Sequence, residues 1–230
     1  MSDDKGDTKV PQRWLPIECN PDTMNKFLYQ CGMPKSWGVS DVFGLDEPLL
    51  AMLPKPVLGI MLLYPIGEDL VPEGVVEEEN KDGVYFMKQT IGNACGTVAM
   101  IHCIANNLES IKVEGGFLKD FLDQSMGKSA DEKANILEYD KDVCNSHDEV
   151  ARAGQSAVPN LNDNVDYHFV ALIEKNGTLY ELDGRKSGPI NRGPTTKESF
   201  VVDAAQICKK YMELDPGNIR FSVLALTPSE

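Results

Sequence analysis

Hydrophobic and polar positions along this 230-residue chain form blocks whose periods predict both strands and helices. The clearest block is the continuous apolar run Val57 to Tyr64, which follows a Pro-Lys-Pro breaker and has the length of a buried strand. Two more strands are predicted at His168 to Ile173 and Thr178 to Asp183, and a last one at Phe221 to Leu226. These segments predict a sheet whose central strand is buried.

Four segments carry helix signals, such as a capping side chain, a proline in the first turn or apolar residues at a helical period. They begin, in chain order, at Asn20, Cys95, Ser129 and Thr195 or Thr196. Gly32 is predicted to end the first helix, and the last is predicted to reach Leu214. Helices and strands alternate without a repeat or a separating linker. The predicted fold class is therefore α/β (α+β), with one domain over residues 13–230 after a loose or disordered polar tail over residues 1–12.

Two stretches lack any periodic pattern. Gly67 to Gly83 is acidic, with three consecutive glutamates at 77–79, and is interpreted as a solvated loop or a frayed helix. Ser146 to Asp166 is rich in small and polar residues, which predicts a loop of about twenty residues. A loop of that length inside a compact domain is usually functional or disordered.

Composition and charge limit the partners of the chain. Hydrophobic residues make up 42% and charged residues 25% of it, which is ordinary for a folded soluble domain. The 36 acidic residues outnumber the 22 basic ones and give a net charge of −14. Such a surface repels phosphate backbones and anionic lipids, so nucleic acid and membrane are excluded as expected partners, and a cationic peptide or protein segment is favoured. The same charge is also consistent with solubility alone.

Neither a membrane span nor a signal peptide is expected, because no stretch of eighteen apolar residues occurs and the first residues are polar. Six scattered cysteines form no C-x-x-C pair, which favours reduced thiols and a cytoplasmic location; they are Cys19, Cys31, Cys95, Cys103, Cys144 and Cys208. The three histidines share no ligand spacing with a cysteine pair. Neither a metal nor another cofactor is therefore expected.

Cys95 is the candidate nucleophile. It follows a turn that contains glycine and asparagine and begins a helix, where unpaired backbone N–H groups and the positive end of the dipole stabilise a thiolate. Gly92 and Gly96 are expected to leave access to the sulfur. For the other five cysteines, a small buried structural residue is the better interpretation.

A thiolate nucleophile needs a base, and three histidines are available. His102 lies on the same helix but about 10 Å further along, which is beyond hydrogen-bond reach. His147 begins the predicted long loop and has no partner that the sequence identifies. His168 starts a strand whose hairpin partner contains Asp183, and a histidine oriented by a carboxylate completes a catalytic triad.

The register of this hairpin has two alternatives. With a four-residue loop, Ile173 faces Thr178 and His168 faces Asp183. With a two-residue Asn-Gly turn, Lys175 faces Thr178, and Asp183 lies diagonal to His168. Both registers place the histidine and the carboxylate on one face of the sheet.

Gln89 is the candidate oxyanion donor. It stands six residues before Cys95, where its side-chain amide could act with the backbone N–H of Cys95 on a tetrahedral intermediate. An exposed turn glutamine is the alternative interpretation of the same spacing.

At these residues the sequence closely resembles the ubiquitin carboxyl-terminal hydrolases, which are small single-domain cysteine deubiquitinases with a papain-like arrangement. The similar segments occur in the family's order and spacing between Arg13 and Leu226. They are Trp14–Pro21, Asp41–Asp46, Gln89–Gly96, Ala105–Asn107, His168–Phe169 and Leu179–Lys186. Within the family, the chain is most similar to the short isozyme type without a carboxyl-terminal extension.

The resemblance implies that Cys95 is the nucleophile, His168 the general base and then acid, Asp183 the orienting carboxylate and Gln89 the oxyanion donor. Chemical reasoning from the residues reached the same four positions. The resemblance further implies a central antiparallel sheet flanked by helices, a knotted backbone, and a crossover loop over about residues 146–166 that spans the active site.

It also implies a ubiquitin-binding surface with Ile17, Glu18 and Asp41, whereas Asn218 stands where some relatives carry an acid. The predicted function is hydrolysis of amide, ester or thioester bonds at the carboxyl-terminal glycine of ubiquitin, or of a closely related ubiquitin-like modifier. Release of small or unfolded adducts and processing of ubiquitin precursors are the expected roles. The expected state is a cytoplasmic monomer.

Three other functions share features with this sequence. A non-catalytic module that holds free ubiquitin would keep the fold, but every triad residue is present here. A papain-like protease of general peptides would carry a secretion signal and a disulfide pattern. A thiol redox protein would need a second cysteine beside Cys95.

Overall fold

The computed structural model describes residues 13–67, 71–77, 82–154 and 165–229. Its strands form one sheet in the order β1-β7-β2-β4-β5-β6-β3, and every pair of neighbours is antiparallel. The strands are β1 (Trp37–Asp41), β2 (Gly59–Pro65), β3 (Val75–Val76), β4 (Tyr167–Lys175), β5 (Thr178–Leu182), β6 (Ile190–Pro194) and β7 (Ser222–Pro228). The predicted α/β class is thus confirmed, while the predicted tail at 1–12 lies outside the described residues.

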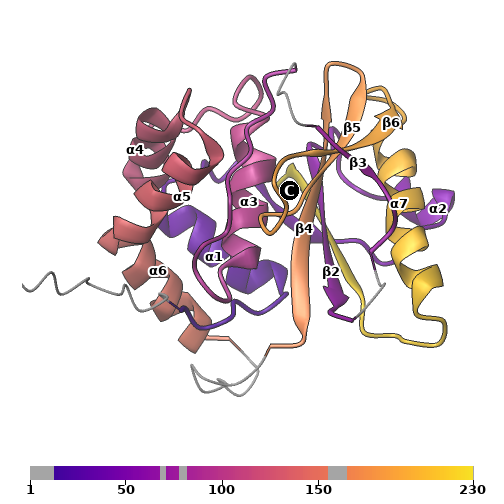
Figure 1. The fold of residues 1–230 in the computed structure, drawn as a ribbon, viewed down its shortest axis with the longest axis horizontal. Helices are drawn as coiled ribbons and strands as arrows, with labels where there is room; N and C mark the ends of the chain where they lie inside the picture. Colours follow the sequence, from indigo (N-terminus) through magenta and orange to yellow (C-terminus); the bar gives the residue numbers. More distant parts are fainter. Residues whose placement is uncertain (1–12, 68–70, 78–81, 155–164, 230) are drawn as a thin grey trace, which may run out of the picture.

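Helices cover both faces of the sheet, as Figure 1 shows. The helices are α1 (Pro21–Gln30), α2 (Glu47–Leu50), α3 (Cys95–Ala105), α4 (Gly116–Ser125), α5 (Ala130–Tyr139), α6 (Lys141–Arg152) and α7 (Phe200–Leu214). Helix α3 packs against one face of the sheet with α1 and α4 beyond it, and α7 covers the other face. Because both faces are covered, a central strand can be apolar along its whole length.

Strand β4 shows how the sheet divides the core. Phe169, Ala171 and Ile173 point into the cluster on the α3 side, whereas Val170 and Leu172 point into the cluster on the α7 side. Strand β2 pairs with residues 167–172 of β4, and β5 pairs with residues 171–175, so the strand is held in register by one neighbour at each end and by both in the middle. At its beginning, His168 is placed by its pairing with Tyr64 of β2.

The β4–β5 hairpin has the two-residue turn. Lys175 pairs with Thr178, and the two turn residues, Asn176 and Gly177, have φ angles of 50° and 82°. Positive φ at both turn positions matches the right-handed twist of the strands, and Asn-Gly adopts it readily. The four-residue alternative is wrong, and Asp183 lies diagonal to His168.

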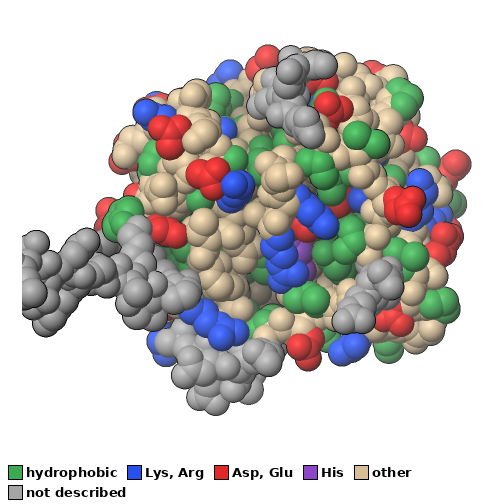
Figure 2. All heavy atoms as spheres, viewed as in Figure 1, with side chains coloured by type: hydrophobic (Ala, Val, Ile, Leu, Met, Phe, Trp, Pro, Cys, Tyr) green, Lys and Arg blue, Asp and Glu red, His purple; other side chains and the backbone are tan. Residues whose placement is uncertain are grey.

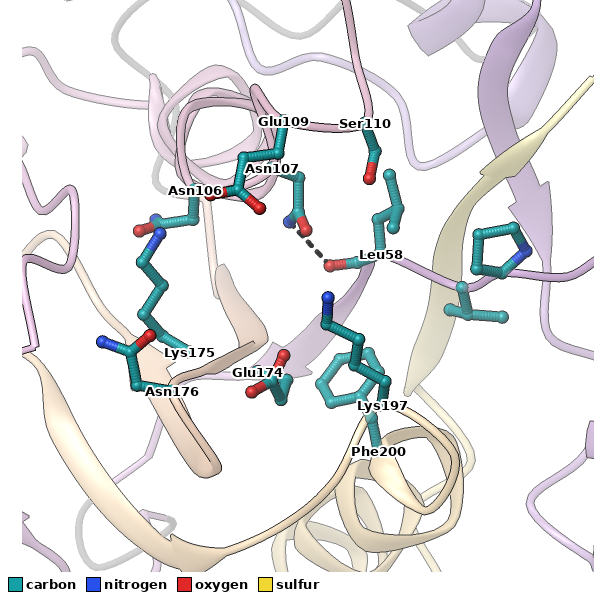
Figure 3. A pocket seen from close by; sticks show the side chains of 12 residues that line it. Leu58, Asn106, Asn107, Glu109, Ser110, Glu174, Lys175, Asn176, Lys197 and Phe200 are labelled. Atoms are coloured by element: carbon teal, nitrogen blue, oxygen red, sulfur yellow. Dashed lines mark hydrogen bonds between the residues drawn. The ribbon is translucent and has the colours of Figure 1, made fainter.

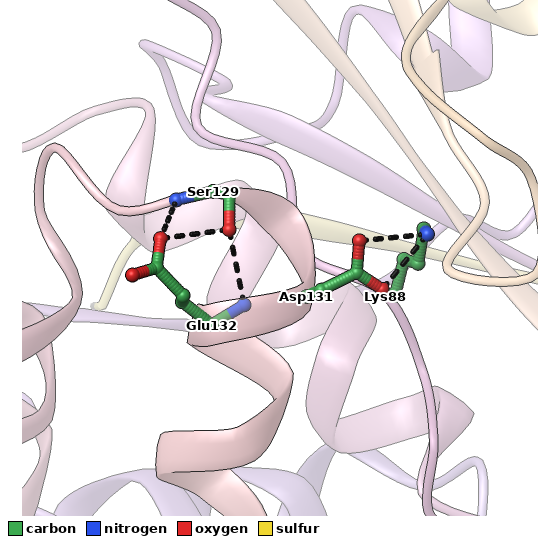
Figure 4. Close-up of polar contacts among 4 residues, drawn as sticks. All are labelled: Lys88, Ser129, Asp131 and Glu132. Atoms are coloured by element: carbon green, nitrogen blue, oxygen red, sulfur yellow. Dashed lines mark hydrogen bonds and ion pairs between the residues drawn. The ribbon is translucent and has the colours of Figure 1, made fainter.

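The predicted helix starts at Asn20 and Ser129 are confirmed. Asn20 accepts a hydrogen bond from the Asp22 N–H at 2.8 Å. Ser129 and Glu132 form a capping box at α5, in which each side chain binds the other residue's backbone N–H (Figure 4). In the last predicted helix, α7 begins only at Phe200, because 196–199 form a turn closed by side-chain hydrogen bonds.

The predicted loop at 146–166 is wrong in its first third, because residues 146–152 are the second half of α6. The Asp140 side chain caps this helix by accepting from two backbone N–H groups, and Val143, His147 and Val150 form a buried stripe at helical spacing. Because one residue of the stripe is a histidine, the helical spacing of apolar residues is not evident in the sequence. Residues 155–164 lie outside the described part of the chain.

Where the structure describes it, the acidic stretch at 67–83 is mostly loop, as one of the two interpretations has it, and it contains one short strand that was not predicted. Val75 and Val76 form the short strand β3, which pairs with Asn191 and Ile190 of β6. The Asn191 side-chain amide also donates to Glu77 at 2.9 Å. This segment therefore covers one edge of the sheet.

Candidate active site

Cys95 is the first residue of α3, and a segment near the amino end of the chain holds the turn before it. The backbone N–H of Trp14 donates to the Gly92 carbonyl at 2.9 Å. The Asn93 side chain, from a residue with φ of 65°, donates back to the Trp14 carbonyl at 3.0 Å. These bonds fix the approach to the helix and so the position of the sulfur.

The two glycines do not serve the access that the sequence suggested. A Cβ at Gly96 would lie 2.5 Å from Cγ2 of Ile17, and one at Gly92 would lie 3.0 Å from Cγ of Arg13. Glycine is required at 96 because another part of the chain packs against it. The expectation of open access is therefore wrong at this position.

The surroundings of Cys95 favour its thiolate. Burial alone would raise the pKa of the thiol, but the neighbouring His168 side chain outweighs it, and the pKa falls below the ordinary 9.0. The Phe169 backbone N–H and the Arg185 charge act in the same direction. By contrast, burial raises the pKa of four other thiols to about 12; these are Cys19, Cys31, Cys103 and Cys208.

His168 and Asp183 form a buried pair beside this thiol. Nε2 of the histidine lies 2.6 Å from Oδ1 of the aspartate, and the two side chains are 0% and 3% exposed. If Nε2 carries the proton that is donated to the carboxylate, Nδ1 is an acceptor. Nδ1 is buried and has no other hydrogen-bond partner among the described residues, so it is available for the thiol proton.

His168 and Asp183 also shift each other's pKa. Burial lowers the pKa of His168, but the bonds and charges of Asp183 and Cys95 outweigh burial and raise it above 6.5. Burial raises the pKa of Asp183, whereas His168 and the Arg185 N–H, which donates to Oδ1 at 2.9 Å, lower it below 3.8. The arrangement favours an imidazolium between two anions.

Gln89 is partly buried and lies at the same site. Its backbone N–H donates to the Gly184 carbonyl at 2.8 Å, one residue beyond Asp183, and its Nε2 donates to the Ile91 carbonyl at 3.1 Å. The alternative of an exposed turn glutamine is therefore wrong. One N–H of Nε2 remains for a second acceptor.

Figure 4 shows how the residue before Gln89 is anchored on the other side. Lys88 Nζ lies 2.8 Å from both carboxylate oxygens of Asp131 in the first turn of α5. The Lys88 backbone N–H also donates to the Ala130 carbonyl at 3.2 Å. The two consecutive residues thus connect the α5 layer with the end of β5.

His102 has a structural environment rather than a catalytic one. It is buried, its Nε2 accepts from the Met87 backbone N–H at 3.1 Å, and its ring stacks on Phe86. Burial lowers its pKa to about 4, so it stays neutral near pH 7.

His147 is fully buried on α6, so the expectation that it begins the long loop is wrong, and the structure shows the partners that the sequence did not identify. Its Nε2 donates to the Leu15 carbonyl at 2.6 Å, and its Nδ1 lies 2.9 Å from the Thr97 hydroxyl. Burial lowers its pKa. It therefore connects α6, the Leu15 segment and the first turn of α3 as a neutral group.

The three residues expected at a ubiquitin surface differ in exposure. Asp41 is exposed at the end of β1, and Glu18 is partly exposed beside Gly154. Ile17 is only 5% exposed and packs against Gly96. The structure places Ile17 in the core, where little of its surface is left for a partner.

The other end of α3 borders a cavity of about 360 Å³. Figure 3 shows charged side chains entering it from different elements, among them Glu109, Glu174, Lys175 and Lys197. Among the residues that the structure describes, no cysteine or histidine lines it. This cavity therefore lacks the thiol and the imidazole that the candidate nucleophile and base provide at the amino end of α3.

Figure 2 shows Lys and Arg side chains near the centre of one face of the molecule, with acidic and hydrophobic side chains around them. The net negative charge is thus not spread uniformly. No helix within the described residues is long and apolar enough to cross a membrane. Among the same residues, no three His, Cys, Asp or Glu side chains gather as a group that could hold a metal ion.

Comparisons with known proteins agree with the chemistry. The family model described as "Ubiquitin carboxyl-terminal hydrolase, family 1" matches residues 14–213. A ubiquitin carboxyl-terminal hydrolase of Drosophila melanogaster is 43% identical over 227 residues, which cover 94% of this chain and 98% of that protein. The rat isozyme L1 is 38% identical over 218 residues, which cover 92% of this chain and 96% of that protein.

A solved structure shares the fold. The catalytic domain of Trichinella spiralis UCH37, bound to ubiquitin vinyl methyl ester, aligns with a TM-score of 0.80 at 21% identity. The alignment covers 97% of this chain and 99% of that one. The family match and the relatives' identity over nearly their whole length lead to one conclusion: the chain belongs to the ubiquitin carboxyl-terminal hydrolases of family 1, a family of cysteine peptidases.

Proposed function

We propose that this chain hydrolyses bonds at the carboxyl-terminal glycine of ubiquitin, with Cys95 as nucleophile, His168 as base and acid, Asp183 as orienting carboxylate and Gln89 as oxyanion donor. The observation that supports this most directly is the buried His168–Asp183 pair, 2.6 Å apart, beside a thiol whose pKa it lowers. Ubiquitin as partner is supported by the ubiquitin derivative bound in the similar Trichinella structure.

The first half of the reaction forms a thioester. Nδ1 of His168 takes the thiol proton, and the Cys95 thiolate attacks the carbonyl carbon of the terminal glycine. The carbonyl oxygen becomes an oxyanion, which accepts from the Cys95 backbone N–H and from Nε2 of Gln89. The imidazolium then gives its proton to the leaving amine, alcohol or thiol as the bond to the carbonyl carbon breaks.

The second half releases ubiquitin. Water loses a proton to His168 and attacks the thioester carbonyl, and the Cys95 thiolate leaves as the carboxylate forms. Asp183 stabilises the imidazolium in both halves by holding Nε2–H. The steps proposed here require no cofactor.

The substrate class is amides, esters and thioesters of ubiquitin with small or unfolded leaving groups, including ubiquitin precursors. Half-burial of Cys95 supports this choice, because a chain end without side chains reaches such a sulfur most easily. We propose that Glu18 and Asp41 contact ubiquitin, and that the buried Ile17 packs beneath this surface. Six free thiols support a reducing, cytoplasmic location, and we propose that the chain acts as a monomer.

The test is release of a fluorescent amide from the ubiquitin carboxyl terminus. We expect turnover with the wild type, none with Cys95→Ala, and ubiquitin affinity of that variant within about tenfold of wild type, since only the sulfur is removed. Cys144→Ala is the matched control, because this thiol is also only partly buried but belongs to α6. Equal turnover by Cys95→Ala would refute the assignment. Absence of turnover in the wild type with ubiquitin bound would favour the non-catalytic binding module.

A further inference from the structure

A second buried carboxylate lies close to the proposed catalytic pair. Glu181 of β5 is 0% exposed and precedes Asp183 by two residues. Residues i and i+2 of an extended segment point to the same face, with Cα atoms about 7 Å apart. Two anions at that separation in the core would each oppose the ionisation of the other.

Arg192 of β6 compensates this second charge. Its Nε and one terminal nitrogen lie 2.9 and 2.7 Å from Oε2 of Glu181, and its side chain is 3% exposed. The guanidinium also donates to the carbonyls of Pro72 and Glu73, so its orientation is fixed from two sides. The ion pair is therefore buried and held in a fixed orientation.

Tyrosines connect the pair to the imidazole. The Tyr211 hydroxyl of α7 donates to Oε1 of Glu181 at 2.7 Å. The Tyr211 ring packs on Tyr64 of β2 at 4.7 Å, and the Tyr64 ring meets the His168 ring nearly edge to face at 5.8 Å and 85°. Contact is thus continuous from the ion pair to the proposed base.

We propose that Arg192 is a positioning residue for the hydrolytic reaction: by neutralising Glu181 it keeps the buried charge behind His168 and Asp183 balanced, so that the thiolate–imidazolium pair forms near neutral pH. This inference rests on the proposed roles of Cys95, His168 and Asp183. The ion pair touches neither substrate nor the reacting atoms and acts only through its field and through the aromatic contacts.

Other charged and titratable groups face this network. Those that face Glu181 are Arg192 from β6, Tyr211 and Cys208 from α7, Tyr64 from β2 and Asp183 from the end of its own strand. Those that face the catalytic pair are Cys95 and His102 from α3, Arg185 after β5 and Tyr64. Arg192 is the cation that pairs directly with Glu181 in this set.

The test uses two variants that leave opposite charges unpaired. Arg192→Gln removes the cation from Glu181, whose pKa burial already raises above 4.5. As far as this carboxyl stays ionised, the unpaired anion should raise the pKa of both Cys95 and His168 and move the whole bell-shaped profile of kcat/KM up, by at most about one pH unit. Glu181→Gln leaves a buried cation and should move the profile down by a similar amount. The double variant Glu181→Gln/Arg192→Gln should return both limbs close to the wild-type positions.

A purely structural ion pair would give another result. It would lower the thermal midpoint in both single variants without moving the limbs in opposite directions, and that outcome would overturn the proposal. Tyr211→Phe is the milder variant if a single variant does not fold. It keeps the ring, removes one hydrogen bond from the anion, and should shift the profile in the same direction as Arg192→Gln by a smaller amount; an unshifted profile contradicts the proposal.

A second readout separates this proposal from the proposed function. The pH dependence of Cys95 alkylation by iodoacetamide, corrected with the Cys95→Ala variant, reports thiolate formation without any ubiquitin substrate. Opposite shifts in alkylation support the charge balance even if hydrolysis of ubiquitin amides is absent. If hydrolysis depends on Cys95 while the pH dependence of its alkylation is the same as wild type in all three charge variants, the proposed function is kept and the role of Arg192 is rejected.

Discussion

The two ends of α3 differ in whether side chains cap the backbone groups that the helix leaves unpaired. At the carboxyl end, Asn106 and Asn107 use their side-chain amides to donate to the carbonyls of His102 and Cys103, each at 2.8 Å. At the amino end the N-cap is Ala94, which has no side-chain acceptor, and no acid occupies the first turn. Backbone N–H groups at that end therefore remain for a thiolate or an oxyanion.

This difference shows that the volume of a cavity does not by itself identify a reactive site. The carboxyl end borders a cavity of about 360 Å³, yet its helix carbonyls are already capped. The amino end keeps its dipole uncapped and places the buried His168–Asp183 pair beside it. Groups left without a local partner mark the end where chemistry can occur.

The largest effect is expected at the amino end. His168→Gln should lower kcat/KM by about 10³-fold, because both the thiol proton acceptor and the imidazolium are lost. His147→Gln is the control, since this buried histidine has only structural hydrogen bonds and should alter stability more than rate. Kinetics with a ubiquitin carboxyl-terminal amide measure both, and equal losses of rate in the two variants would remove the distinction between them.

Uncapping the carboxyl end should change stability instead of rate. Asn106→Ala removes hydrogen bonds to the backbone N–H and carbonyl of Tyr85 and to the carbonyl of His102. We expect the free energy of unfolding to fall by about 3 kcal/mol, because buried backbone groups lose their partners. Urea denaturation measures this loss. The specific activity of the folded fraction should stay within about twofold of wild type. A tenfold drop would show that the carboxyl end of α3 affects the reaction at its amino end.

Acid should also destabilise the carboxyl half of α3. His102 has a pKa of about 4 in the folded protein against an ordinary value of 6.5, so the unfolded chain binds more protons between these values. Stability conferred by the neutral ring is present above 6.5 and is lost as pH falls toward 4, by about 2 kcal/mol at pH 5. Denaturation at pH 5 and pH 8 measures it, and a His102→Asn variant should show a flatter dependence.

The smallest effect is expected inside the cavity at the carboxyl end of α3. Lys197→Ala removes a side chain that lines it without a role in the proposed reaction. Activity should stay within about twofold and the thermal midpoint within about 1 °C, as for surface changes in general. A strong loss of hydrolysis would show that this end of the helix also takes part in function.

Sequence alone predicted the elements whose signals are local. The Asn20 cap, the Ser129–Glu132 box, the apolar run of β2 and the Asn176-Gly177 turn each depend on a few neighbouring residues. The hairpin then limited His168 and Asp183 to one face, which is why the candidate pair could be named before its geometry was known.

Long-range contacts decided the rest. Strand β1 and strand β6 have weak alternation and exist because β7 and β5 pair with them. The buried position of Ile17 and the packing role of Gly96 depend on a contact across 79 residues of sequence. Helix α6 was missed because His147 is one of its core residues, and a buried histidine looks polar in any hydrophobic pattern.

The strand order also bears on how the chain reaches its folded state. Strand β7, close to the end of the described residues, lies between β1 and β2. Until a ribosome has released residues 222–228, β1 has no strand to pair with, and β2 can pair only with β4. The sheet therefore closes late in synthesis and through pairings of large sequence separation, which predicts slow folding and a need for chaperones while its edges remain open.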